Sequence, residues 1–213
     1  QKEVYELRRA SPSPMANRRG PQSMNIGWLY AGSREAVEYF TVLRDELKAR
    51  VAQGKGFISQ ERFRLMCIFP PPPIEWKMLD WMEKEHGATI VADPFYFHWG
   101  EWEIDPSRPL ISLARKCFAS PVSRHLHGPA LAGALPDTVA DALSHRAEGA
   151  IYWANIACRH GCALIRSIKD ALWKEVDIPT VVLDSDMLDP SVSPEAELKD
   201  KLEGFLEILQ GRR

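Results

Sequence analysis

With 213 residues, the chain can bury a sizeable core, and one or two domains are possible. Its net charge of −2 provides no broad basic surface, so we expect neither nucleic acid nor an anionic membrane as a partner. No apolar run approaches the roughly 20 residues of a membrane span. The start at Gln1 is neither Met nor a secretory signal, which suggests a processed chain or a fragment of a larger protein.

Residues 1–57 are expected to form a helical arm or interdomain segment, because no strand signal is convincing there. A helix that begins near Lys2 cannot pass the two prolines of residues 11–14. A long amphipathic helix follows Ser33, which can cap it, and ends at Gly54. The face that we expect to be buried contains Ala36, Tyr39, Phe40, Leu43 and Leu47.

Residues 58–213 are expected to form an α/β domain, because apolar strands alternate with helices there. The predicted strands cover residues 63–69, 88–92, 150–156 and 178–183. The predicted helices cover residues 74–86, 107–120, 137–147, 158–176 and 193–209, and Ser193 is the expected cap of the last one. This alternation predicts an open four-stranded parallel sheet with helices on both faces, in the flavodoxin-like order 2-1-3-4.

The predicted strand order places a ligand crevice at the carboxyl ends of the first and third strands. The first strand ends at Phe69, before a run of prolines, and the third ends just before Cys158. The aromatic loop after the second strand would border the crevice, either as an apolar wall for substrate or as a cover for the sheet edge. The candidate substrate-binding residues are Phe95, Tyr96, His98 and Asn155. The chain has neither a dinucleotide-binding glycine motif nor a P-loop.

Cys158 is the candidate metal ligand at this crevice. It precedes a helix whose N-terminus stabilises anions, so the position favours the thiolate form that binds iron. A small buried core residue is the alternative. Cys162, four residues later, could share the metal, but packing is the favoured interpretation for it. Cys67 and Cys117 are expected in the core, and four dispersed cysteines favour a reducing, cytoplasmic setting.

Other polar residues carry weaker signals. His98 could donate to a thioester or could be an ordinary loop histidine. His125 and His127 could suit a metal or a phosphate, although a polar surface stretch is the favoured interpretation. Asp184 and Asp186 resemble an acid pair, or they simply cap and solvate a strand end.

Several segments, taken in order, resemble the 2-hydroxyacyl-CoA dehydratase / benzoyl-CoA reductase family. Residues 149–159 (GAIYWANIACR) resemble its D-G-V-I-x-x-x-N-R-S-C-K signature, with Cys158 at the family's cysteine. Residues 178–186 (IPTVVLDSD) resemble G-I-P-x-L-x-I-D-G-D, and residues 193–207 resemble the closing helix. Residues 85–91 (EHGATIV) are similar to E-E-x-G-A-x-V-V, and residues 5–9 resemble the helix that enters the second domain. The resemblance covers essentially the whole chain.

The resemblance implies a subunit of two similar α/β domains that hold an oxygen-sensitive [4Fe-4S] cluster between them. Cysteines of both domains hold the cluster, and Cys158 matches the one from the C-terminal domain. The resemblance also implies a heterodimer with a second subunit, an acyl-CoA substrate and a separate ATP-hydrolysing iron–sulfur activator that supplies one electron. The N-terminal domain with the other cluster cysteines is absent from this sequence.

The expected function is therefore that of the C-terminal half of a radical (R)-2-hydroxyacyl-CoA dehydratase subunit. A benzoyl-CoA reductase-type subunit, which reduces an aromatic acyl-CoA, is the first alternative. A non-catalytic scaffold without a cluster is another, and a flavodoxin-like module for another small ligand is a weaker one. Ile156 and Ala157 replace the usual Arg-Ser before the cysteine, and Gly161 and Cys162 also depart from the pattern, which leaves the substrate open.

Overall fold

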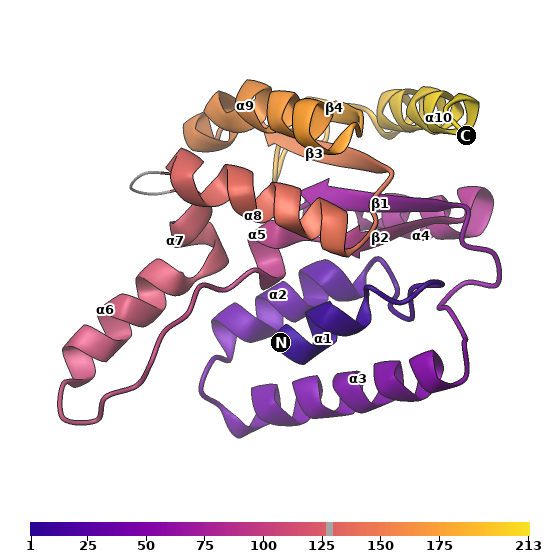
Figure 1. The fold of residues 1–213 in the computed structure, drawn as a ribbon. Helices are drawn as coiled ribbons and strands as arrows, with labels where there is room; N and C mark the ends of the chain where they lie inside the picture. Colours follow the sequence, from indigo (N-terminus) through magenta and orange to yellow (C-terminus); the bar gives the residue numbers. More distant parts are fainter. Residues whose placement is uncertain (127–129) are drawn as a thin grey trace.

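The computed structural model describes residues 1–126 and 130–213, and a parallel sheet runs through its centre (Figure 1). Its strands are β1 (Phe63–Ile68), β2 (Ala88–Ala92), β3 (Gly149–Asn155) and β4 (Thr180–Ser185). All neighbouring strands pair in parallel, in the order β2-β1-β3-β4. The fold class and strand order predicted from the sequence are confirmed. β1 and β2 are buried along their whole length, which explains their nearly continuous apolar sequences.

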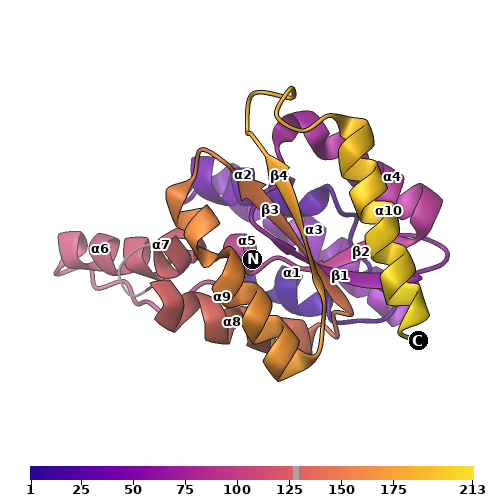
Figure 2. The ribbon, with the colours of Figure 1, turned by 90° about the horizontal axis from the view of Figure 1, so that it is seen from above.

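Helices cover both faces of the sheet, as parallel strands with crossover connections require. Figure 2 shows α8 (Ala130–Ser144) and α9 (Arg159–Val176) on one side, and α4 (Trp76–His86) and α10 (Glu195–Gly211) on the other. The turn η1 (Pro73–Glu75) leads into α4, and Gly87 ends α4 with a left-handed φ of 64°.

The start of α10 differs from the prediction. Pro194 occupies the N-cap position, whereas the Ser193 hydroxyl donates a hydrogen bond to the carbonyl oxygen of Asp184 (2.5 Å). The prediction that Ser193 caps this helix is therefore wrong, because its hydroxyl ties the preceding loop to the end of β4 instead.

Three helices precede the sheet and lie together below it in Figure 1. They are α1 (Lys2–Leu7), α2 (Arg19–Leu29) and α3 (Arg34–Ala52). α3 begins as predicted, because the Ser33 hydroxyl accepts a hydrogen bond from the Ala36 amide (3.1 Å). The expected face of α3 is turned inward: Ala36, Leu43 and Leu47 are buried, and Tyr39 and Phe40 are partly buried. α2 is not among the predicted helices.

The side chain of Asn17 joins the N-terminal helices to the edge of β2. Its amide group donates to the carbonyl oxygen of Ala88 (3.0 Å), and its oxygen accepts from the backbone amide of Ile90 (2.6 Å). The backbone amide of Asn17 donates to the Glu83 carboxyl on α4 (2.6 Å). One buried side chain thus satisfies backbone groups of β2 that have no further strand beside them.

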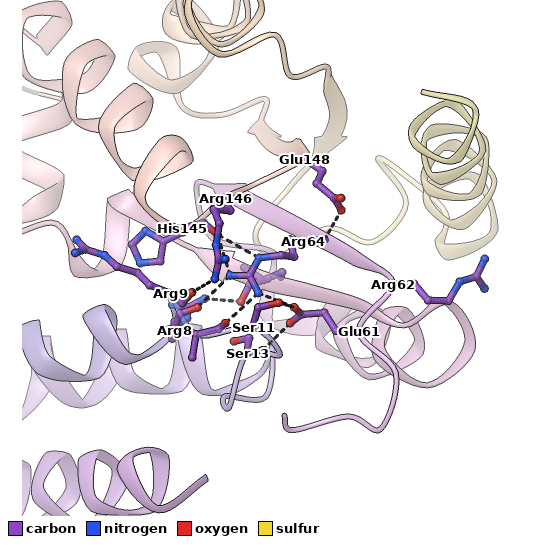
Figure 3. A network of polar contacts seen from close by, with 12 residues as sticks. Arg8, Arg9, Ser11, Ser13, Glu61, Arg62, Arg64, His145, Arg146 and Glu148 are labelled. Carbon is purple, nitrogen blue, oxygen red and sulfur yellow. Dashed lines mark hydrogen bonds and ion pairs between the residues drawn. The ribbon is translucent and has the colours of Figure 1, made fainter. Parts of the chain in front are cut away.

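Arg64 on β1 provides a second junction between the N-terminal segment and the sheet (Figure 3). Its guanidinium donates to the carbonyl oxygens of Ala10 (3.0 Å) and His145 (2.8 Å) and pairs with Glu61 (2.5 Å). Polar contacts from Asn17 and Arg64 therefore bind residues 1–57 to the strands. The boundary near residue 57 remains a prediction.

The segment between β2 and α8 is more helical than expected. Much of the aromatic loop is the short helix α5 (Pro94–Phe97), and α6 (Pro109–Ala119) and α7 (Pro121–Leu126) follow. α6 projects from the body in Figure 1, and it exposes Leu110, Leu113 and Phe118. Cys117 is exposed on α6, so the prediction that it is a core residue is wrong, because this helix buries Ser112 and Ala119 instead.

No helix within residues 1–126 and 130–213 has both the length and the apolar character that crossing a membrane requires.

Candidate functional site

The carboxyl ends of β1 and β3 lie side by side at the point where the strand order reverses. β3 ends at Asn155, and Cys158 follows as the N-cap residue of α9. The Cys158 sulfur accepts a hydrogen bond from the Gly161 amide (3.3 Å), a group that would otherwise lack a partner in the first helical turn. Cys158 is half-buried and lines a cavity, so its thiol is not sealed within the core.

This cavity has a volume of about 180 Å³, and its lining is mostly aromatic and aliphatic. Six lining residues belong to segments that the sequence pointed to: Phe69, Pro70, Phe95, Tyr96, Asn155 and Cys158. The structure therefore brings three of the four candidate substrate-binding residues to one cavity beside the candidate metal ligand.

The other lining residues escaped the sequence analysis as site residues. They are Met24, Trp28, Val122, Leu126 and Met187. Met24 and Trp28 are one helical turn apart on α2, a helix that the sequence did not predict, and Met187 follows β4. Phe69, by contrast, was placed at the crevice from the sequence, as the last residue of the first predicted strand.

Phe69 has an unusual backbone conformation, with a φ of 64°. The left-handed region is strained for a bulky residue, and such strain gathers at ligand sites. The Phe69 carbonyl oxygen accepts a hydrogen bond from the Cys67 thiol (3.3 Å). Its ring packs against Phe95 with centroids 4.3 Å apart and against Tyr152 at 5.4 Å. These contacts hold the ring at the end of β1, beside the N-terminus of α9.

Cys162 is also half-buried, but its thiol has a partner. Its sulfur donates to the carbonyl oxygen of Asn155 (3.3 Å), and the Asn155 side-chain oxygen accepts from the Ala157 amide (3.1 Å). Beneath both cysteines, the Tyr152 hydroxyl donates to the carbonyl oxygen of Gly161 (2.6 Å). Burial, and then the two nearby thiols, raise the pKa of Tyr152, so this hydroxyl stays protonated and ties β3 to the first turn of α9.

His98, the fourth candidate substrate-binding residue, lies elsewhere. It borders a neighbouring cavity of about 520 Å³, where its Nδ1 lies 3.0 Å from Asp141 and its Nε2 lies 3.4 Å from Asp137. The Tyr5 hydroxyl donates to the same Asp141 carboxylate (2.7 Å). Burial by itself would lower the pKa of His98, but the hydrogen bond and charge of Asp141, joined by Asp137, raise it. The structure thus separates His98 from Cys158.

His125 is fully buried, so its interpretation as a polar surface residue is wrong. Its Nε2 lies 2.8 Å from the Asp137 carboxylate, which Arg124 also binds through two nitrogens (2.5 and 3.0 Å). Burial would raise the pKa of Asp137, but hydrogen bonds from His125 and Arg124 hold it well below its ordinary value. His127 lies outside the described residues.

Asp184 and Asp186 do not form an acid pair at the site. Asp184 is exposed, and an Asp186 side-chain oxygen accepts from the backbone amides of Leu188 (2.9 Å) and Asp189 (3.0 Å). The capping interpretation holds for Asp186, which closes the turn after β4.

The described residues do not provide a complete set of metal ligands. Among them, no group of three or more His, Cys, Asp or Glu side chains is placed to hold one. The donor at the strand-order reversal is the thiol of Cys158, which borders an apolar cavity. This arrangement fits one ligand of an iron–sulfur cluster and does not fit a complete ligand set.

The fold and the site define an open α/β domain with a thiol at the switch point of a parallel sheet. The chain belongs to the family described as 2-hydroxyglutaryl-CoA dehydratase, D-component, whose model matches residues 1–209. The family resemblance drawn from the sequence segments is confirmed.

Characterised relatives are distant. The chain is 24% identical over 194 residues to a benzoyl-CoA reductase component from Thauera aromatica, covering 86% of this chain and 44% of that protein. It is 23% identical over 205 residues to the (R)-phenyllactyl-CoA dehydratase alpha subunit of Clostridium sporogenes (95% and 48%). It is 22% identical over 208 residues to the (R)-2-hydroxyisocaproyl-CoA dehydratase alpha subunit of Clostridioides difficile (96% and 48%). The chain spans about half the length of these relatives.

Proposed function

We propose that the chain is the Cys158-bearing part of a subunit in a radical (R)-2-hydroxyacyl-CoA dehydratase. The observation that carries this proposal is the half-buried Cys158 thiol at the N-terminus of α9, beside an apolar cavity at the strand-order reversal. Two relatives are named as alpha subunits of (R)-2-hydroxyacyl-CoA dehydratases, which supports an enzyme subunit of this type.

Cys158 would hold a [4Fe-4S] cluster as one of its ligands, with the remaining cysteines supplied elsewhere in the assembled enzyme. A bound cluster would supply the one-electron chemistry that an otherwise unfavourable β-elimination needs. The residues of this chain position the Cys158 thiolate and shield an acyl group from water. The first-turn amides of α9 stabilise negative charge near the Cys158 sulfur. Phe69 and Phe95 form an apolar wall that keeps water from an acyl group in the cavity.

A benzoyl-CoA reductase-type subunit is the second candidate. Two observations favour it: the aromatic rings of Phe69, Phe95 and Tyr96 around the cavity, and the similarity to the benzoyl-CoA reductase component from Thauera aromatica. Both functions use the same thiol and the same cavity, and they differ in the reaction that follows electron transfer.

The proposal includes a second subunit and an ATP-hydrolysing activator as partners. Its structural support is α6, a projecting helix with an uncovered apolar face. The exposed side chains Leu110, Leu113 and Phe118 are 79%, 61% and 72% accessible. An apolar surface of this kind is typical of a protein–protein contact.

Iron analysis tests the role of the thiol. The chain is co-expressed with its partner subunit and activator without oxygen, and iron and sulfide are measured in the purified enzyme. Cys158→Ala should lose most of the bound iron, whereas the exposed Cys117→Ala should retain it. Iron that is unchanged by Cys158→Ala would support the cluster-free scaffold instead.

Turnover then separates the two reactions. The reconstituted enzyme is assayed with (R)-2-hydroxyacyl-CoAs and with benzoyl-CoA. Dehydration without ring reduction supports the dehydratase, ring reduction without dehydration supports the second candidate, and neither activity in an iron-loaded enzyme would contradict both.

A further inference from the structure

We propose that Cys158 and Cys162 form a reversible disulfide bond when the chain holds no iron. The bond withdraws the metal-binding thiol until a reducing thiol releases it. Cys162 thereby gains a role that the proposed function does not give it. Only the consequence for iron binding rests on the proposed function, because the disulfide itself requires no cluster.

The two cysteines occupy one turn at the start of α9. Cys158 is the N-cap residue, and the Cys162 amide donates a hydrogen bond to the Cys158 carbonyl oxygen (3.0 Å). A helix rises about 1.5 Å per residue, which puts the two Cα atoms roughly 6 Å apart. Disulfides join Cα atoms that are about 4.4–6.8 Å apart, so the backbone spacing suits a bond.

The carbonyl oxygen of Asn155 holds the Cys162 thiol close to the start of the helix. This oxygen accepts a hydrogen bond from the Cys158 backbone amide (2.8 Å) and another from the Cys162 thiol (3.3 Å). The Cys162 side chain therefore turns back toward the N-terminus of α9, as helical side chains usually do. Both cysteines are half-buried, so a small reagent can reach them.

Closing the bond requires a small shift at Cys158, which its cap position permits. Side chains four residues apart in a regular helix have Cβ atoms about 5–6 Å apart, whereas a disulfide needs about 3.8 Å. Cys158 has a non-helical backbone, with a φ of −98° and a ψ of 95°, so it can move without unwinding the helix beyond it. Its sulfur accepts one weak hydrogen bond, from the Gly161 amide (3.3 Å). A bond closed in this way is strained, and strained disulfides are readily reduced.

The other two cysteines are placed differently. Cys67 is 2% exposed within β1, and its thiol donates to the carbonyl oxygen of Phe69 (3.3 Å). Cys117 is exposed on α6, outside the first turn of α9. Of the four cysteines, Cys158 and Cys162 are therefore the pair that combines access with proximity.

The bond forms by exchange with a small disulfide such as oxidised glutathione. The Cys158 thiolate, favoured at a helix N-terminus, attacks one glutathione sulfur, and one glutathione leaves as its thiolate. The Cys162 thiolate then attacks the Cys158 sulfur and releases the second glutathione. Two protein thiols thus lose two protons and two electrons, and oxidised glutathione becomes two reduced molecules. The bridge keeps Cys158 from irreversible oxidation to sulfinic acid.

Peptide mass spectrometry of the metal-free chain tests the proposal, with Cys117→Ser as the background so that the exposed thiol does not interfere. The protein is equilibrated with oxidised glutathione, trapped with N-ethylmaleimide and digested. A bridge between Cys158 and Cys162 that dithiothreitol removes should be the main product. Glutathione retained on Cys158, thiols that stay free, or a bond from Cys158 to Cys67 would overturn the proposal.

Cys162→Ser in the same background identifies the second thiol of the exchange. Without Cys162 the mixed disulfide has no intramolecular attacker, so the amount of glutathione on Cys158 should rise by at least about tenfold. Equal amounts of this adduct with and without Cys162 would contradict its role.

The trapping experiment and the iron analysis fail independently. A reversible bridge, together with iron that is unchanged by Cys158→Ala, would count against the proposed function alone. Iron that depends on Cys158, without any bridge in the metal-free chain, would count against the disulfide alone.

Discussion

Glu83 on α4 makes the attachment of the N-terminal helices sensitive to pH. Its carboxyl is 6% exposed and accepts a hydrogen bond from the Asn17 amide (2.6 Å). Burial raises the pKa of Glu83 from 4.5 to about 7, and the Asn17 amide offsets this only in part. Between these two values the folded protein binds more protons than the unfolded chain, so stability falls as pH rises through this window.

Glu83→Gln removes the charge and keeps an oxygen acceptor for the Asn17 amide. The rise in pKa corresponds to a destabilisation of about 3 kcal/mol above pH 7, which partial access of water to the carboxyl reduces to about 2 kcal/mol. We expect the variant to be more stable than the wild type by that amount at pH 8, and to match it near pH 4.5. For a chain of this length, the gain is about 4–8 °C in Tm.

Thermal unfolding followed by circular dichroism at pH 4.5 and pH 8 measures the effect, and Glu85→Gln on the exposed side of α4 is the matched control. No gain for Glu83→Gln at pH 8, or an equal gain at both pH values, would refute the burial of a charged carboxyl at this position.

Four further substitutions are tested by urea unfolding. Arg8→Met leaves the buried Asp93 carboxylate unpaired and should cost about 3–5 kcal/mol; a cost below about 1 kcal/mol would contradict the ion pair at 2.5 Å. Tyr152→Phe removes the hydroxyl that donates to the first turn of α9 and should cost about 1 kcal/mol, whereas an unchanged midpoint would argue against that bond. Gly149→Ala places a Cβ atom 2.8 Å from a ring of α10 and should cost about 1–3 kcal/mol. Gly204→Ala, with open space around it, should stabilise by about 0.5–1 kcal/mol, and equal effects of the two glycine changes would exclude the close approach at β3.

The strands could be predicted because their signals are local. β1 and β2 are buried on both faces, so the sequence of each is a short, mostly apolar run that ends at a proline or a loop. The cap at Ser33 and the left-handed Gly87 also follow from a few adjacent residues. Such features depend on backbone geometry and hydrogen bonding within a few residues.

α2 could not be predicted, because its sequence argues against a helix. Gly20, Pro21 and Gly27 have poor helix propensity. Two glycines of α2 lie close to neighbours outside the helix: a Cβ atom at Gly20 would lie 2.8 Å from the Asp93 carboxylate, and one at Gly27 would meet the end of the Gln1 side chain. Close packing of backbone on side chain stabilises α2 where propensity does not.

The histidines illustrate the same limit. His125 carries no apolar pattern that would predict full burial, and the partner that makes its burial acceptable is Asp137 on another helix. His98 is one residue beyond α5, yet it turns to Asp141 rather than to the cavity that Phe95 and Tyr96 line.

The amino-acid sequence by itself determined the parallel sheet, its order, and the position of Cys158 at the end of β3, because strand period and crossover topology are properties of consecutive residues. The tertiary structure alone decided which side chains share the cavity with that thiol. Met24 and Trp28 arrive from α2 and Met187 from beyond β4. Their meeting depends on how helices pack on the sheet, a contact between distant segments that no local pattern encodes.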